Sequence, residues 1–216
     1  MEDAQRTRSP GRPPSQQLDR AIHEATIEAL SEVGFEALSV ADVARRAGTT
    51  TPAIYRRFAN KRALVLQTLD HEFASVPVGV PDQGSLRADL LAWTRHIVNG
   101  LTPARTRLIA GLVFTARTDP SPRERLTATV QKLGASSWLH ITQRALTRGE
   151  LSGAPSQAML GSVPTALVLH AVLLEDRPVD DTMVEELVDT IMLPALIAAY
   201  PASRGDSPVR SRAGGR

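Results

Sequence analysis

Basic side chains are concentrated between residues 39 and 62 of this chain. Six of them stand against a single acidic residue, Asp42, so this stretch has a formal charge of +5 while the whole chain has only +2. The six are Arg45, Arg46, Arg56, Arg57, Lys61 and Arg62. Such groups bind nucleic-acid phosphates, and an arginine can also bind both acceptors on the edge of a guanine. The charge therefore indicates a local contact with nucleic acid, with a solvated helix surface as the simpler alternative.

The residues around these charges predict two short helices joined by a tight turn. Ser39 is a good N-cap, and Asp42 three residues later completes a capping-box pattern. Apolar residues then recur at helical spacing, at Val40, Val43, Ala44 and Ala47. Gly48 follows the last of them, where a left-handed residue ends a helix.

A second helix, at about Thr51–Phe58, follows this turn. Thr50 can cap it, and Pro52 lies in its first turn, where a missing N–H costs little. Ile54 and Phe58 share one side of the helix, which leaves small and polar residues on the others. A helix, a glycine-containing turn and a second helix form the helix-turn-helix pattern, whose second helix enters the major groove of DNA. We therefore predict that this segment binds DNA.

The composition of the chain favours an all-α fold. Hydrophobic residues make up 42% of the 216 residues and aromatic ones only 4%, so the core depends on aliphatic side chains. No sustained alternation of apolar and polar residues predicts a strand. We expect about nine helices, and those outside the helix-turn-helix lie at about 18–33, 60–75, 85–100, 103–118, 122–148, 156–175 and 181–199.

Breaks in this pattern divide the chain into four parts. We expect a disordered basic arm at 1–17, a helix-turn-helix domain at 18–75, a larger helical body at 76–200 and a disordered tail at 201–216. The boundary after residue 75 rests on the linker-like composition of the segment VPVGVPDQG that follows it.

The patterns typical of catalytic and metal sites are absent from the sequence. His23 and Glu24 begin like the zinc-protease pattern His-Glu-x-x-His, but Ile27 occupies the place of the second histidine. The five histidines have no metal-ligand spacing, and the absence of cysteine excludes thiolate chemistry. We predict no catalytic residue, no metal and no cofactor. Without a recognisable signal peptide or membrane span, we expect a soluble, cytoplasmic protein that does not bind membranes.

Residues 18–69 resemble the DNA-binding domain of the tetracycline-repressor (TetR, AcrR-type) family of bacterial one-component regulators. The resemblance rests on the spacing of Ala25, Gly34, Phe35, Ser39, Val40, Val43, Ala44, Ala47, Gly48, Tyr55, Phe58, Lys61 and Leu64. It implies a homodimer whose second and third helices form the DNA-binding motif. It also implies that the body at 76–200 is a ligand-binding and dimerisation domain, which releases DNA when a small effector binds.

The resemblance assigns individual residues to the DNA contact. Thr50, Thr51, Ala53 and Arg56 match positions that face bases or the nearby backbone, and Arg56 is our choice for reading a guanine. Tyr55 and Lys61 match phosphate-contacting residues, although Tyr55 could instead be a core aromatic residue. The expected DNA-binding set is Ser39, Arg45, Thr50, Thr51, Ala53, Tyr55, Arg56, Lys61 and Arg12. Ser39 belongs to it because helix N-termini favour anions, whereas Arg45 has the alternative of being solvated surface.

Arg12 belongs to a short pattern of its own, Pro10-Gly11-Arg12-Pro13. It resembles the Gly-Arg-Pro core of AT-hook segments, in which an extended arginine enters a narrow minor groove. Minor-groove arms beside a major-groove helix are an established arrangement. The alternative is a leader in which the arginines are incidental.

The last two predicted helices are apolar on two sides, so each needs two partners. We expect one partner to be the body itself and the other a second copy of the chain, with a more enclosed monomeric core as the alternative. A two-fold dimer would match a palindromic operator. The expected interface residues are Met159, Val163, Leu167, Leu174, Leu187 and Ile191.

The effector pocket follows from the resemblance, because the middle helices enclose the ligand cavity in this family. Its expected residues are Trp93, His96, Phe114, Trp138 and His140, each of which could instead be packing. We predict a ligand-responsive repressor that binds a palindromic operator as a homodimer. A ligand-independent activator or architectural DNA-binding protein is the alternative, and an enzyme is a remote one.

Overall fold

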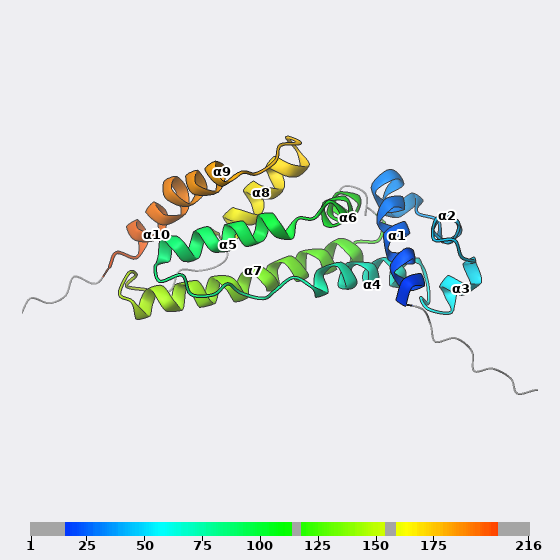
Figure 1. Cartoon of the computed structure of the whole chain (residues 1–216), viewed down its shortest axis with the longest axis horizontal. Coiled ribbons are helices and arrows are strands. Elements are labelled where there is room, and N and C mark those ends of the chain that lie inside the picture. Colours follow the sequence, from blue (N-terminus) through cyan, green and yellow to red (C-terminus); the bar gives the residue numbers. More distant parts are fainter. Residues whose placement is uncertain (1–15, 114–117, 154–158, 203–216) are drawn as a thin grey trace, which may run out of the picture. The chain divides into compact units, whose positions relative to one another are not determined.

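The computed structural model describes residues 16–113, 118–153 and 159–202, and every regular element in these ranges is helical (Figure 1). In chain order the elements are α1 (Gln16–Ala37), α2 (Val40–Arg46), α3 (Thr51–Tyr55), α4 (Lys61–Ala74), α5 (Leu86–Gly100), α6 (Pro103–Val113), α7 (Ser121–Thr147), η1 (Leu160–Ser162), α8 (Val163–Leu173), α9 (Asp181–Glu186), η2 (Leu187–Met192) and α10 (Leu193–Ala199). The last three form one continuous helix with a π-helical middle. The described ranges then contain nine helices and the short 3-10 turn η1, which confirms the all-α prediction.

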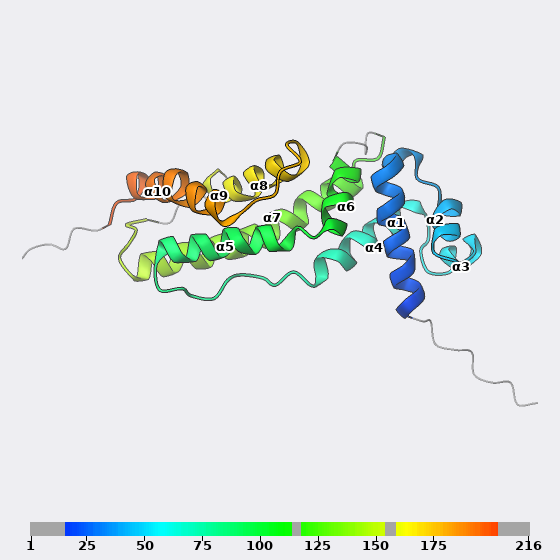
Figure 2. The same cartoon turned by 45° about the horizontal axis from the view of Figure 1, so that its top comes forward.

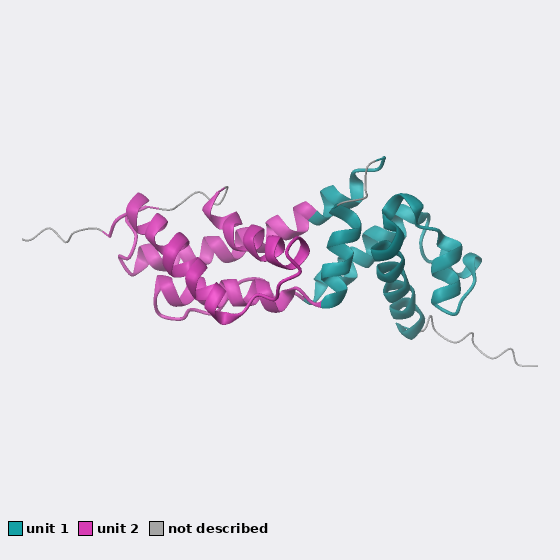
Figure 3. Cartoon of the chain, turned by 90° about the horizontal axis from the view of Figure 1, so that it is seen from above, with its two compact units in different colours: residues 1–75, 103–126 teal, residues 76–102, 127–216 magenta. Residues whose placement is uncertain are grey.

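The chain divides into two compact units, drawn in different colours in Figure 3. The first contains the residues up to Ser75 together with Pro103–Leu126, and the second contains Val76–Thr102 and everything from Thr127 onward. The sequence led us to expect one contiguous boundary after residue 75. In the structure, α6 and the start of α7 belong instead with the helix-turn-helix.

Gly111 explains why α6 groups with α1. A Cβ atom built on Gly111 would lie 2.6 Å from the backbone oxygen of Leu30 on α1. Only a residue without a side chain allows the two backbones this close approach. Leu30 is fully buried, and so are Leu108 and Leu112, which flank the glycine on α6. The contact therefore lies in the core of the first unit.

Helix α1 is interrupted at Gly34, where the sequence predicted its end. This glycine has φ 72° and ψ 176°, which are not helical, and a short helical piece follows it to Ala37. Beyond the kink, Phe35 and Leu38 are buried. The change of direction at Gly34 thus lets these two side chains pack in the core of the first unit. Figures 1 and 2 show α2 following directly after this bend.

The second unit is built on α5, the larger part of α7, α8 and the C-terminal helix. Its centre contains Trp93 and Trp138, which are almost fully buried and whose ring centroids lie 5.8 Å apart. Val188, Met192 and Leu196 of the C-terminal helix are buried in the same cluster. This core sets which face of each helix is left exposed.

A fully buried carboxylate, that of Asp89 on α5, joins the segment before α5 to α7. It accepts hydrogen bonds from the backbone N–H of Gln83 at 2.8 Å and from Arg148 Nη2 at 2.9 Å, and Arg144 Nη1 lies 3.5 Å away. Arg144 also donates to the backbone oxygen of Val80. Two guanidinium groups and a backbone amide thus supply the hydrogen-bond donors that a buried carboxyl group needs.

Candidate nucleic-acid interface

Helices α2 and α3 form the helix-turn-helix that the sequence predicted. Gly48, in the turn, has φ 62°, a left-handed conformation that side chains disfavour. Thr50 caps α3, since its hydroxyl accepts a hydrogen bond from the backbone N–H of Ala53 at 3.3 Å. Val43, Ile54 and Phe58 are buried and hold the motif against the rest of the first unit. The local signals for the turn and for the start of α3 are therefore confirmed.

The capping box expected at the start of α2 is wrong. Ser39 occupies the N-cap position, but its side chain caps no backbone N–H. Asp42 instead pairs with Arg45 and with Arg46, whose Nε lies 2.7 Å from its carboxylate. These guanidinium groups, Arg46 first, hold the pKa of Asp42 below its usual value. The carboxylate is drawn to the two arginines, one helical turn further along α2, and away from the cap.

Half of the six predicted basic groups are neutralised by partners distant in the sequence. Arg46 makes two hydrogen bonds to Glu32 on α1, at 2.8 and 2.6 Å, which lower the pKa of that carboxylate. Ion pairs of 2.7 and 2.8 Å join Arg57 to Asp19 and Arg62 to Asp119. The positive charge that this segment offers to DNA is therefore smaller than its composition suggests. These acidic partners were missed, and the nearby sequence gives no signal for them.

Lys61 lies at the first position of α4 and is bound to the end of α1. Its ammonium donates to the backbone oxygens of Phe35 and Glu36, both at 3.0 Å, and lies 4.9 Å from the centre of the Phe35 ring. Two of its three protons thus hold the segment beyond the kink at Gly34. The predicted phosphate contact would have to use the remaining proton or replace these bonds.

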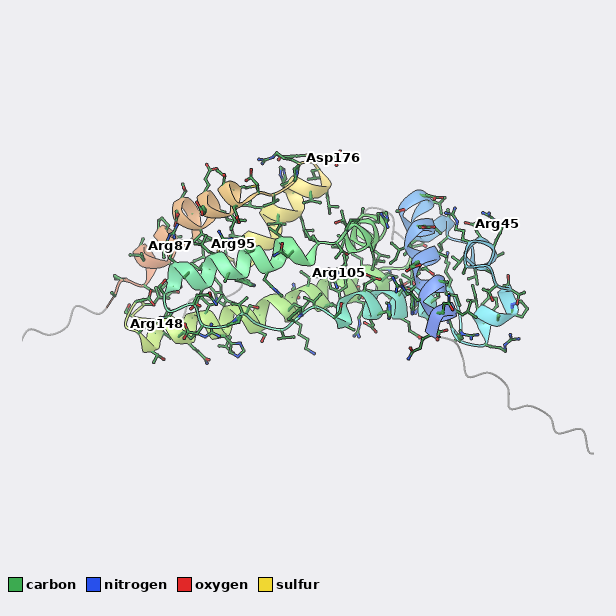
Figure 4. All side chains as sticks on the ribbon, in the orientation of Figure 1. Arg45, Arg87, Arg95, Arg105, Arg148 and Asp176 are labelled. Carbon is green, nitrogen blue, oxygen red and sulfur yellow. The ribbon has the colours of Figure 1, made fainter. Side chains whose placement is uncertain are left out.

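Two residues with groups suited to DNA stand out on α3 and just after it. Arg56 is exposed, and in the described part of the chain it has no ion-pair partner. Tyr55 has half of its surface exposed, so it is not the core aromatic residue of the alternative interpretation. Thr50 is exposed and Thr51 half-buried, while on α2 the paired side chain of Arg45, labelled in Figure 4, is 72% exposed.

Ala53 is a correction to the expected set. Only 6% of its surface is exposed, because its methyl group lies on the inner side of α3 beside Ile54. A buried methyl group cannot face a base. Arg12, the last member of the set, lies outside the described residues.

The expected pocket residues have different positions in the second unit. Trp93 and Trp138 fill its core, as described above. His96 is half-buried, and its Nε2 lies 3.0 Å from the backbone oxygen of Pro77. His140 is exposed and lines a surface cavity of about 230 Å³ with Arg144 of the same helix, α7, and with Arg148, which directly follows α7. Phe114 lies outside the described residues.

The expected interface residues divide into exposed and buried ones. Met159 is 77% exposed, Leu174 64% and Ile191 44%. Val163 and Leu167 on α8 are partly buried against the core of the second unit. Leu187 is a correction, because it is 5% exposed and packs in that core. The exposed members of the set thus lie before α8, directly after it and on the C-terminal helix.

Two features are absent from the part of the chain that the structure describes. No helix in the described part of the chain is long and apolar enough to cross a membrane. In the same residues, no three histidine, aspartate or glutamate side chains are grouped so that they could hold a metal ion.

A helix-turn-helix with an exposed arginine and tyrosine, joined to a larger helical unit, defines a DNA-binding transcriptional regulator. Comparison with known proteins agrees with this class. Residues 22–68 match the family model of bacterial regulatory proteins of the tetR family, and residues 80–191 match the tetracyclin repressor-like C-terminal domain. The chain belongs to the TetR family.

Individual relatives support this assignment along most of the chain. An uncharacterised HTH-type transcriptional regulator of Mycobacterium tuberculosis is 31% identical over 172 residues, which are 79% of this chain and 84% of that protein. The DNA-binding transcriptional repressor TetR of Mycobacteroides abscessus is 28% identical over 80% of this chain and 90% of its own length. A putative TetR-family regulator from Rhodococcus sp. has the same fold, with a TM-score of 0.65 at 19% identity over 84% of this chain and 99% of that one.

Proposed function

We propose that this regulator is a ligand-responsive repressor that binds a palindromic operator as a homodimer. The observation that carries the DNA contact is the exposed pair Tyr55 and Arg56 at the end of α3, which Thr50 and Gly48 orient. An arginine can bind both acceptors of a guanine, and a tyrosine hydroxyl can donate to a phosphate. A relative named as a transcriptional repressor supports repression rather than activation.

The homodimer is supported by the apolar surface of the second unit. Leu174 and Ile191 are exposed although both are large aliphatic residues. Large aliphatic side chains that remain exposed can form part of a protein–protein interface. A second copy related by a two-fold axis would cover both and would place two helix-turn-helix motifs on successive half-sites.

The effector is proposed to bind in the second unit, whose sequence matches the repressor-like C-terminal domain. An effector that enters the core of this unit would meet Trp93 and Trp138, and small-molecule sites favour aromatic and apolar side chains of this kind. An effector of this kind acts by preferring the state that does not bind DNA.

Selection from a random pool of double-stranded DNA tests the proposal directly. The purified protein is mixed with the pool at low salt, and the bound fragments are sequenced. We expect an inverted repeat whose half-sites lie about one helical turn apart. A single, non-repeated site would contradict the dimer, and enrichment of nothing would contradict operator binding by the protein without ligand.

The basic arm is included in the proposal. Arg12 in its Gly-Arg-Pro setting would enter the minor groove beside the operator half-site. Deletion of residues 1–16 should then weaken operator binding and reduce the dependence of affinity on salt, because fewer phosphate counterions are released. Unchanged affinity and an unchanged salt slope would show that the arm is an incidental leader.

A further inference from the structure

The first unit contains a cavity of about 590 Å³ whose lining includes none of the residues proposed to contact DNA. Its walls come from α1, α4 and α6, all within this unit. The volume lies in the range of sites that bind small organic molecules, roughly 300–1,000 Å³. Its lining is unusually polar, so the chemistry of that lining constrains the occupant.

The floor of the cavity includes His23 of α1, whose tautomer follows from its hydrogen bonds. Only 8% of His23 is exposed, and its Nδ1 lies 2.9 Å from the hydroxyl oxygen of Thr68. That hydroxyl donates its one proton to the backbone oxygen of Leu64, also at 2.9 Å. It can therefore only accept from His23, so Nδ1 carries the imidazole proton and Nε2 carries a lone pair.

This lone pair is open to the cavity. Nε2 of His23 has no hydrogen-bond partner among the described residues. Among the same residues, every side-chain nitrogen or oxygen atom that is fully buried has a hydrogen-bond partner. Nε2 is therefore not sealed off, and His23 lines the cavity. Burial, and then the neighbouring His71, lower the pKa of His23 to about 4, so the ring stays neutral and keeps its acceptor at ordinary pH.

The rim of the cavity adds further acceptors. Three glutamates and two arginines line it, so the carboxylates outnumber the guanidinium groups by one. Arg20 is already paired with Glu24 at 2.8 Å, whereas the carboxylates of Glu28 and Glu72 have no ion pair with any described residue. An occupant thus meets carboxylates that are more exposed and an imidazole lone pair that is more buried. It must bring hydrogen-bond donors and preferably a positive charge.

We propose that this cavity binds a small organic cation with N–H donors, such as an amidine, a guanidine or a primary amine on a flat ring. The donors would reach Nε2 of His23 and the carboxylates of Glu28 and Glu72. The stacked imidazoles of His23 and His71, with centroids 4.5 Å apart, offer an aromatic wall for the ring. The site is independent of the effector pocket proposed for the second unit, and its test involves no DNA.

Three probes of the same shape and different charge test the inference. Benzamidine is the cation, benzamide its neutral counterpart and benzoate the anion. Each is titrated into the full-length protein while the imidazole C–H signals are followed by NMR. We expect benzamidine alone to shift the signals of His23 and His71 saturably and to leave those of His96, His140 and His170 unchanged. Equal binding of the three probes, or no saturable shift at millimolar benzamidine, would overturn the proposal.

Charge-removing variants locate the site. Replacing Glu28→Gln and Glu72→Gln together should weaken benzamidine binding about ten-fold or more, because two charge-assisted hydrogen bonds are lost. Glu124→Gln makes the same kind of change on an exposed glutamate of the same unit that does not line the cavity. It should leave the affinity unchanged. A similar loss in all variants would mean that the cation responds to net charge only and would also overturn the proposal.

Discussion

At the scale of single residues, Arg56 differs from the other basic groups of its segment. Arg46, Arg57 and Arg62 are held by acidic side chains, and Lys61 by two backbone carbonyls. Arg56 is exposed without such a partner in the described part of the chain. It can reach a ligand without first breaking an ion pair, which favours it for base recognition.

Replacing Arg56→Ala should therefore weaken binding to the selected operator by about 1–3 kcal/mol, the usual cost of a lost bidentate contact to guanine. The variant should lose its discrimination at one base pair of each half-site. Fluorescence anisotropy with operators that differ only at that base pair measures this loss. Arg177→Ala, in the second unit, serves as the control. A uniform loss over all sequences would instead identify Arg56 as a phosphate contact.

His23 gives the first unit a predictable pH dependence. Its pKa is lowered from 6.5 to about 4 in the folded chain, chiefly by burial and also by His71. As the pH falls from about 6.5 to about 4, the unfolded chain takes up a proton that the folded chain does not, so the free energy of unfolding decreases. The full loss is about 3 kcal/mol and is complete only below the folded pKa.

Urea denaturation between about pH 7 and pH 5 measures this slope. The variant His23→Gln cannot titrate, so its stability should change less with pH, even if it is less stable throughout. An equal slope in the two proteins would assign the pH dependence to other groups.

At the scale of helices, local signals found in the sequence were enough to predict each element of the helix-turn-helix. Gly48 and Thr50 act on their immediate neighbours, and the structure has both in the predicted conformations. Contacts between distant segments could not be predicted in this way. Arg46 and Glu32, or Gly111 and Leu30, meet only after the chain has folded.

Where a helix is apolar on several sides, the sequence also could not predict which side chains are buried and which are exposed. Leu187 and Ile191 lie one turn apart, and their spacing could not tell which of them faces the chain's own core. The structure buries Leu187 and exposes Ile191. Ala53 was misplaced for a related reason, since an alanine fits both an inner and an outer face of a short helix.

The packing of α6 on α1 leads to a stability prediction. In Gly111→Ala, the new methyl group would meet the backbone oxygen of Leu30 at 2.6 Å, and backbone cannot move aside as a side chain can. We expect a destabilisation of about 1–3 kcal/mol, the usual cost of overpacking.

Chemical denaturation of the wild type and the variant measures this cost. Gly100→Ala is the matched control, because nothing lies within 4 Å of its added Cβ atom. Glycine in a helix is less favourable than alanine, so this control should be neutral or slightly more stable. A stable Gly111→Ala variant would contradict the close approach of α6 and α1.

At the scale of the whole molecule, the exposed leucine and isoleucine of the second unit should determine the oligomeric state. Replacing Leu174→Glu and Ile191→Glu together would place two charges in the proposed dimer interface, where they could not be solvated. We expect a shift from dimer to monomer in sedimentation velocity and a loss of specific binding to the inverted repeat. Non-specific binding to DNA, which depends on phosphate contacts, should remain.

Val78→Glu is the control, since Val78 has the same 64% exposure as Leu174 but lies outside the proposed interface. It should remain dimeric. A wild-type protein that sediments as a monomer at micromolar concentration would contradict the proposed dimer before any variant is made.

The path of the chain between the two units limits how this regulator can be re-engineered. The chain crosses between them three times, since α6 returns to the unit that contains the helix-turn-helix. A hybrid made by exchanging only the segment before residue 76 would give α6 a foreign α1, whose backbone must still come within reach of Gly111. Functional chimeras should therefore exchange residues 103–126 together with the N-terminal segment, so that operator specificity is transferred as a two-piece graft.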